Sequence, residues 1–177
     1  KNYKFLLFFR MILVVAFIIC CFLEPVYGYG VDEVEKDAIE IPQVCNVLLE
    51  PLQTGKSTSR ILSVKCGTNF NLHDFGTNAY FLAHFYDDVN YRNILISYYG
   101  TEMCSSSISY GVSQVSSSID NRISSGAGYS GCNYIYVYDL ANYTGDSTSC
   151  FANCSSFGSL NDRVSSWRIK KKKKMLS

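Results

Sequence analysis

The chain has 177 residues and a formal net charge of +1, and 47% of its residues are hydrophobic while 18% are charged. This balance is typical of a globular chain with one domain of ordinary size and some appendages. Residues 29–169 contain eight basic and fourteen acidic residues, a net charge of −6, which argues against a nucleic-acid-binding protein with a basic folded face.

A secretory signal peptide is predicted at residues 1–28. Residues 5–23 are almost wholly apolar, with basic residues before them and a Glu-Pro pair after them. A membrane anchor is the alternative, because these 19 residues approach the roughly 20 that cross a bilayer. Arg10 shortens the uninterrupted apolar run to 13 residues, which fits a cleaved signal better. We therefore expect a secreted, extracellular protein.

Six cysteines lie outside the signal segment: Cys45, Cys66, Cys104, Cys132, Cys150 and Cys154. An even number in an exported chain predicts three disulfides, and the sequence leaves their pairing open. In a reducing compartment the same residues would instead be buried free thiols. The disulfide prediction therefore depends on the signal peptide.

Residues 29–78 are interpreted as an N-terminal extension that is partly flexible. The extension begins with an acidic stretch, to about residue 44, that shows no strong periodicity. Short apolar runs at 45–49 and 61–66 then alternate with turn-rich segments and indicate extra strands. One arrangement open to them is a hairpin pinned to the main domain by one of its cysteines.

Beyond residue 78 the sequence predicts β-strands. Tyrosines alternate with Ile and Val over 134–138, the period of a strand with two different faces. Residues 79–86 occupy the equivalent place before an earlier turn, and 94–99 are rich in β-branched and aromatic residues. Because no segment here has a 3.6-residue period, the predicted class is all-β with many short strands.

Two phrases occur twice, in the same order. Residues 86–93 match 138–145 as an aromatic, four residues, an aromatic, one residue, and then Asn or Gly. Farther on, 120–125 (DNRISS) matches 161–166 (NDRVSS). Two elements repeated in one order indicate an internal duplication. Gly145 suits a positive φ at the end of the turn, and Asn93 is its most tolerable substitute.

The hexapeptides supply only oxygen donors: side chains of Asn or Asp, hydroxyl groups, and backbone carbonyls. Ca²⁺ takes six to eight hard oxygen ligands in loose geometry, so this pattern favours calcium. Zinc or copper would prefer His and Cys, and neither His73 nor His84 has such neighbours in the sequence. Both histidines are interpreted as surface or strand residues.

The order of aromatic turn and N/D-N/D-x-x-S/T-S loop, closed here by Ser166-Trp167, resembles the calcium-binding, microbial and invertebrate branch of the βγ-crystallin family. The resemblance covers residues 79–169. It implies a two-sheet sandwich of two Greek-key motifs, here 79–126 and 132–169, with four strands each. It also implies two Ca²⁺ sites between the motifs, each drawing ligands from both loops.

By position, the resemblance implies backbone carbonyl ligands from the two arginines, hydroxyl ligands from the first serine of each loop, and side-chain oxygens from the Asn and Asp residues. The residue after the first tyrosine of each turn would add a carbonyl. The implied ligand set is Asp87, Asp120, Asn121, Arg122, Ser124, Asp139, Asn161, Asp162, Arg163 and Ser165.

The first motif departs from this pattern in two respects. It has about eleven more residues between its turn and its loop, which we place in a longer loop over 104–118. It also has Asn93 where the second motif has Gly145. The second loop therefore follows the family pattern more closely.

A basic tail ends the chain at 170–177. It is either a solvated extension, which could touch an anionic membrane surface, or the translated adenine-rich end of a transcript. Calcium is otherwise the only partner that the sequence indicates.

Three functions are compatible with these features. No zinc helix, nucleophile elbow or complete phosphate-binding loop occurs, so we expect no enzyme activity. The leading hypothesis is a secreted calcium-binding protein in which Ca²⁺ stabilises the fold. A secreted effector, such as an antimicrobial or killer toxin or a protease inhibitor on the same fold, is the alternative. An intracellular stress or storage protein would require a non-native leader and reduced cysteines.

Overall fold

The computed structural model describes residues 44–67, 75, 76 and 78–172. The expected signal peptide, the acidic lead-in, His73 and the last residues of the basic tail lie outside this part of the chain. Among the described residues, no helix is long and apolar enough to cross a membrane.

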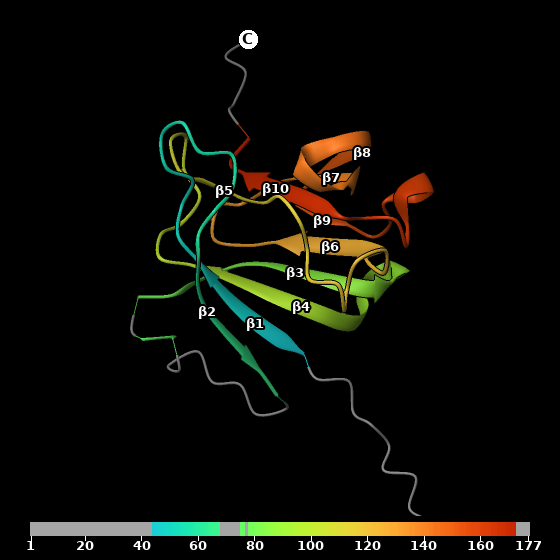
Figure 1. Cartoon of the computed structure of the whole chain (residues 1–177), viewed down its shortest axis with the longest axis horizontal. Helices are drawn as coiled ribbons and strands as arrows, with labels where there is room; N and C mark the ends of the chain where they lie inside the picture. Colours follow the sequence, from blue (N-terminus) through green and yellow to red (C-terminus); the bar gives the residue numbers. More distant parts are fainter. Residues whose placement is uncertain (1–43, 68–74, 77, 173–177) are drawn as a thin grey trace, which may run out of the picture. The chain divides into compact units, whose positions relative to one another are not determined.

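The described residues form two β-sheets (Figure 1). One sheet has the strand order β2-β1-β4-β3-β6-β9, and the other has the order β5-β10-β7-β8. The strands are β1 (Cys45–Leu49), β2 (Ile61–Cys66), β3 (Tyr80–Asp88), β4 (Arg92–Gly100), β5 (Ser109–Val112), β6 (Ser125–Gly128), β7 (Tyr134–Leu140), β8 (Thr144–Phe151), β9 (Asn153–Cys154) and β10 (Ser166–Lys170). Short 3₁₀ turns are η2 (Val89–Tyr91), η3 (Ala141–Tyr143) and η4 (Gly158–Leu160).

The two motifs exchange one strand each. In the first motif β3, β4 and β6 share the larger sheet, whereas β5 pairs with β10 in the smaller one. In the second motif β7, β8 and β10 share the smaller sheet, whereas β9 pairs with β6 in the larger one. The predicted all-β sandwich of two Greek-key motifs is therefore confirmed.

The core lies between the sheets and is rich in aromatic side chains. Trp167 is fully buried, and its ring lies 4.5 Å from Tyr98 and 5.3 Å from Phe85, centroid to centroid. In β7 the side chains of Ile135 and Val137 are also fully buried, while the tyrosines between them are partly exposed. The period of two read from this segment thus distinguishes its core face from its outer face.

A hairpin of β1 and β2 extends the larger sheet, because β1 pairs in parallel with β4. Val47 and Leu49 of β1 are buried, whereas most of β2 is exposed at the sheet edge. Cys45 bonds to Cys66 and so closes the hairpin on itself. Strand pairing and burial of β1, with no disulfide involved, hold the hairpin to the rest of the domain.

The other two disulfides are Cys104–Cys132 and Cys150–Cys154, so the expectation of three disulfides is confirmed. Cys104 lies in the connection between β4 and β5, residues 101–108, whereas residue 152 alone connects β8 to β9. Most of the extra residues of the first motif are in this connection, so the predicted longer loop over 104–118 is correct only for its first part: the connection ends at residue 108, where β5 follows.

Candidate metal centre

The two repeated hexapeptides meet between the motifs. The first hexapeptide, 120–125, precedes and enters β6, and the second, 161–166, precedes and enters β10. Ser165 Oγ donates a hydrogen bond to Asp120 Oδ1 over 2.6 Å, and Ser124 Oγ donates one to Asp162 Oδ1 over 2.6 Å. Each loop therefore supplies a hydroxyl to one cross-loop contact and a carboxylate to the other.

The acid comes from a different position in each loop. Asp120 is the first residue of its hexapeptide, and Asp162 is the second residue of its own. Both nevertheless reach the equivalent serine of the opposite loop. Each loop has one acid in this phrase, so each cross-loop contact receives one negative charge.

Backbone hydrogen bonds hold the loops in this arrangement. Asn121 N donates to Val164 O over 3.3 Å, and Asp162 N donates to Ile123 O over 3.2 Å. Asn121 and Asp162 both have a left-handed backbone, with φ of 58° and 56°. Asn and Asp tolerate this conformation better than most residues, which is a local reason for their place in the phrase.

The last serine of each hexapeptide ties its loop to the aromatic turn of the same motif. Ser125 Oγ donates to Asp88 O over 2.5 Å and accepts a bond from Tyr91 N over 3.2 Å. Ser166 Oγ donates to Leu140 O over 2.7 Å and accepts one from Tyr143 N over 3.1 Å. This tie to the turn was not predicted from the sequence, although the recurrence of the serine in both copies was the available signal.

The arginines make a second link between loop and turn. Arg122 donates to both carboxylate oxygens of Asp87, over 2.8 and 3.2 Å, and also to Ser118 O over 3.0 Å. Arg163 donates to Asp139 Oδ2 over 2.7 Å and to Ser159 O over 3.2 Å. The bond to Asp87 raises the pKa of Arg122 above its usual value. Because the arginines are exposed, we assign these ion pairs a positioning role and little stability.

The aromatic turns have matching geometry in the two motifs. The ring centroids of Tyr86 and Tyr91 are 5.8 Å apart at 71°, and those of Tyr138 and Tyr143 are 5.7 Å apart at 72°. In both motifs the residue two positions after the second tyrosine has a left-handed backbone: Asn93 has φ 56° and Gly145 has φ 76°. Asn93 thus adopts the backbone conformation expected of a substitute for glycine.

The expected ligand residues fall into two groups. Asp120, Ser124, Asp162 and Ser165 form the two cross-loop contacts. The remaining six are near the loops but engaged otherwise or turned outward. Asn161 Oδ1 accepts bonds from Phe157 N and Ser156 Oγ within its own turn, and Asn121 is exposed. Arginine binds both carboxylate oxygens of Asp87 but only Oδ2 of Asp139, and the role expected of both residues is that of their backbone carbonyls.

In the part of the chain that the structure describes, several oxygens near the loops have no hydrogen-bond partner. Within the described residues, the carbonyl oxygens of Arg122 and Arg163 accept no hydrogen bond, although those of the next residues, Ile123 and Val164, do. Asp139 Oδ1 is buried and also has no hydrogen-bond partner there. Buried polar groups are normally paired. Carbonyl, hydroxyl and carboxylate oxygens without full partnering are the donor set that suits Ca²⁺.

The histidine that the structure describes is in β3 and takes no part in the two cross-loop contacts. His84 Nδ1 is 2.9 Å from Ser97 Oγ, and the imidazole packs against Phe81 and Tyr129. Burial lowers the pKa of His84 to about 4. No group of three or more His, Cys, Asp or Glu side chains with metal-site spacing occurs in the described ranges. The interpretation of His84 as a strand residue is therefore confirmed.

No family model and no curated protein matches the sequence. Solved structures do match. The N-terminal domain of Protein S has 18% identity and a TM-score of 0.40, with 51% of this chain and 96% of that chain covered. A βγ-crystallin domain from Clostridium beijerinckii has 23% identity and a TM-score of 0.39, with 51% and 99% covered. A βγ-crystallin domain from Flavobacterium johnsoniae has 20% identity and a TM-score of 0.37, with 53% and 99% covered.

The chain's own geometry defines the class of protein. Its two motifs exchange their third strands between the sheets, and the loops before their fourth strands cross between the motifs. The domain therefore has a βγ-crystallin fold, and the resemblance stated from the sequence is confirmed at the level of the fold.

Proposed function

We propose that the protein is a secreted, non-enzymatic βγ-crystallin-type protein that binds two Ca²⁺ ions, and that the ions stabilise its fold. The observation that carries the proposal is the pair of crossed contacts, Ser165 with Asp120 and Ser124 with Asp162. Each contact places a hydroxyl and a carboxylate oxygen together at 2.6 Å, at the junction of two motifs. A cation bound at both contacts would link the motifs from both sides.

The first site would be held by Ser124 Oγ, Asp162 and the carbonyl of Arg122. The second would be held by Ser165 Oγ, Asp120 and the carbonyl of Arg163. The carbonyls of Asp87 and Asp139 are the remaining candidates, since ion pairs hold these residues against the two arginines. When bound, the ion supplies charge compensation to the carboxylates and no reaction chemistry.

Modest affinity follows from the charge of each site. One carboxylate per cross-loop contact is fewer than tight calcium buffers use, so we expect a dissociation constant of roughly 10⁻⁶ to 10⁻³ M. Calcium at about 100 times the dissociation constant stabilises a one-site fold by about 2.7 kcal/mol. This is a large share of the roughly 5–15 kcal/mol by which folded proteins are stable.

Secretion is supported by the three disulfides, because such bonds persist in oxidising compartments. An extracellular protein also meets enough free calcium to occupy sites of modest affinity. The disulfides and the affinity range thus support the same location.

Calorimetric titration and thermal unfolding, each in calcium and in chelator, test the proposal. We expect binding heat for two equivalents of Ca²⁺ and a higher melting temperature in calcium than in chelator. Mg²⁺ is the matched comparator, since it demands tighter octahedral geometry and should shift the melting temperature less. If calcium gave no binding heat and no shift in melting temperature, the proposal would be wrong.

A further inference from the structure

A second candidate site lies at the far end of β10, one of the two strands that the repeated hexapeptides enter. β10 enters the centre at Ser166 and ends four residues later at Lys170, about 13 Å farther along at the usual rise per residue. There a pocket of about 320 Å³ opens between the start of β5, the start of β7 and the end of β10. It is lined by serines and Ile108 of 105–109, by Tyr134 and Tyr136, and by Lys170–Lys172.

The pocket is positively charged. Three consecutive lysines line it, and no Asp or Glu is among its lining residues. The four ion pairs of the described chain involve none of these lysines. The positive charge of this wall is therefore not neutralised by a carboxylate in the part of the chain that the structure describes.

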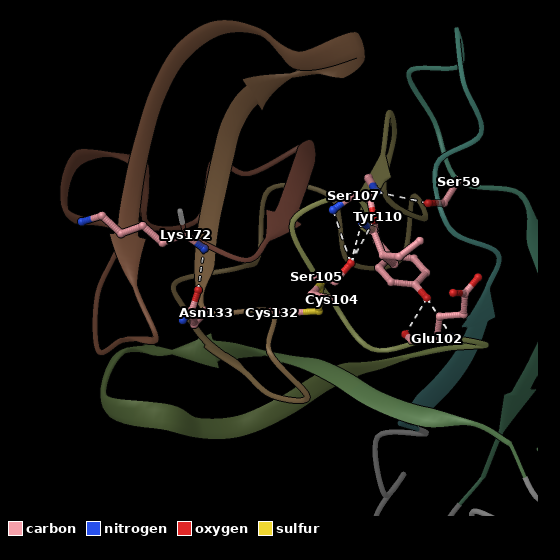
Figure 2. The surroundings of a disulfide bond; sticks show 11 residues. Ser59, Glu102, Cys104, Ser105, Ser107, Tyr110, Cys132, Asn133 and Lys172 are labelled. Carbon is pink, nitrogen blue, oxygen red and sulfur yellow. Dashed lines mark hydrogen bonds between the residues drawn. A yellow bond between two sulfur atoms is a disulfide. The ribbon is translucent and has the colours of Figure 1, made fainter. Parts of the chain in front are cut away.

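Aromatic rings hold two of the lysine ammonium groups over the same wall. Lys170 Nζ lies 4.8 Å from the centre of the Tyr136 ring. Lys172 Nζ lies 5.3 Å from the centre of the Tyr134 ring and 5.4 Å from that of Phe151, a residue of β8 outside the pocket lining. The backbone is fixed as well, because Lys172 N donates to Asn133 Oδ1 over 2.8 Å (Figure 2). Cation–π contacts of this kind position an ammonium group without neutralising its charge.

The serine wall has a defined shape. Ser105 Oγ accepts bonds from Ile108 N over 3.1 Å and Ser107 N over 3.3 Å, which folds the segment into a tight turn. The Cys104–Cys132 disulfide lies next to this turn (Figure 2). Cys104 N also donates to Ser130 O over 3.0 Å. The hydroxyl oxygens of Ser105 and Ser107 lie 3.2 Å apart, and both residues line the pocket together with the lysines.

From this juxtaposition of unneutralised lysines and braced serine hydroxyls we propose that the pocket binds a small polyol that carries a phosphate or sulfate ester. Ammonium groups without acidic neighbours select an anion, and serine hydroxyls can bond both to ester oxygens and to ligand hydroxyls. The volume is at the lower end of the roughly 300–1,000 Å³ of small-molecule sites, which suits a ligand the size of one sugar.

This site is independent of the calcium proposal, because none of its lining residues belongs to the calcium loops. The two proposals can therefore fail separately. Titration in calcium-free buffer measures the pocket alone, and the calcium melt needs no ester.

The test is a titration of the full chain with glucose 6-phosphate, glucose 6-sulfate and glucose at about 0.15 M salt, where unspecific charge contacts are largely screened. Calorimetry gives affinity, and amide chemical shifts locate the site. We expect at least one ester to bind and to shift the amides of 105–109 and 134–136, and glucose not to bind. The ester that binds more tightly identifies phosphate or sulfate as the preferred group.

A double variant, Lys170→Gln with Lys172→Gln, should weaken ester binding at least tenfold. Lys56→Gln is the matched control, since Lys56 is an exposed lysine outside the pocket. Both lysines of the double variant are exposed, so its unliganded melting temperature should stay close to that of the wild type. Binding of neither ester, equal binding of glucose, or an equal loss in Lys56→Gln would each overturn the proposal.

Discussion

The hydroxyl of Ser165 donates a 2.6 Å hydrogen bond to the carboxylate of Asp120, a residue of the other Greek-key motif. Ser165 is 7% exposed, so this polar contact is made inside the junction of the two motifs. Its counterpart between Ser124 and Asp162 has the same length. The internal repeat of the sequence thus produces a pair of reciprocal contacts between the motifs.

Ser165→Ala should lower calcium affinity about tenfold at one site, because the substitution removes a hydroxyl ligand and the partner of a charged carboxylate. Ser155→Ala is the matched control, since the Ser155 side chain is exposed and the residue contributes only its carbonyl to Asn90 N. Calorimetric titration of both variants measures the difference. Equal affinities in the two variants would contradict the assignment of Ser165 as a ligand.

Gly145→Ala should destabilise the domain more than Gly158→Ala does. Both glycines have a left-handed backbone, with φ of 76° and 64°, so both substitutions cost about 1–2 kcal/mol of backbone strain. A methyl group at Gly145 would also overlap Asp139 Oδ1, whereas the space around Gly158 is open. Overpacking of this kind costs about 1–3 kcal/mol more.

Urea unfolding monitored by fluorescence of Trp167, the single tryptophan of the chain, measures this difference. Displacement of Asp139 would also disturb its ion pair with Arg163 and so the second hexapeptide loop. The Gly145 variant should therefore lose calcium affinity, and the Gly158 variant should keep it. Equal free energies of unfolding in the two variants would show that Asp139 moves aside at no cost.

His84 should make the folded state less stable in mild acid. Burial lowers its folded-state pKa to about 4, below the value near 6.5 of an unfolded chain. Between these values the unfolded state binds a proton that the folded state does not, so the free energy of unfolding falls as pH drops from 6.5 to 4. Above pH 6.5 the imidazole is neutral in both states and this effect is absent.

Urea unfolding at several pH values between 4 and 7 measures the slope, which should become smaller in His84→Gln. Ser97→Ala is the control, because it removes the 2.9 Å contact to the imidazole but leaves a titrating histidine in place. Its slope should stay close to that of the wild type. A slope unchanged by His84→Gln would assign the acid sensitivity to other groups.

Much of the fold could be predicted from the sequence, because local patterns determine it. The alternation around Ile135 and Val137 gave the strand period and its buried face, and the left-handed turn at Gly145 was visible as a glycine. The repeat placed Asp120 and Ser165 in comparable loops. The sequence could not show that the single acid of each loop contacts the serine of the opposite loop, because that contact depends on how the motifs pack. The acid is the first residue of one hexapeptide and the second residue of the other.

Pairwise contacts between distant segments likewise could not be predicted from the sequence. Arg122 was expected to contribute a carbonyl, yet its side chain also binds the carboxylate of Asp87. The closure of Cys45 with Cys66 could not be chosen among the alternatives, because disulfide pairing depends on which strands lie side by side. The pocket near the end of β10 is lined by 105–109, by two tyrosines of β7 and by Lys170–Lys172. These segments are far apart in the chain, and only the folded arrangement of β5, β7 and β10 brings them together.

Removal of the Cys104–Cys132 disulfide should destabilise the protein more than removal of Cys150–Cys154. The first bond joins residues 28 apart and the second joins residues 4 apart, so the first restricts the unfolded chain over a longer loop. The loop-entropy relation gives a difference of about 2 kcal/mol between them. Double Cys→Ala variants of each pair, compared by urea unfolding under the same oxidising conditions, measure it.

The two variants should also differ in the pocket. Because Cys104 braces the serine turn, loss of the Cys104–Cys132 bond should loosen 105–109 and raise amide hydrogen exchange there. The Cys150–Cys154 variant keeps that brace and should leave exchange in 105–109 unchanged. Equal exchange in both variants would mean that the hydrogen bonds of Ser105 alone hold the turn, and the disulfide would then act only through the unfolded state.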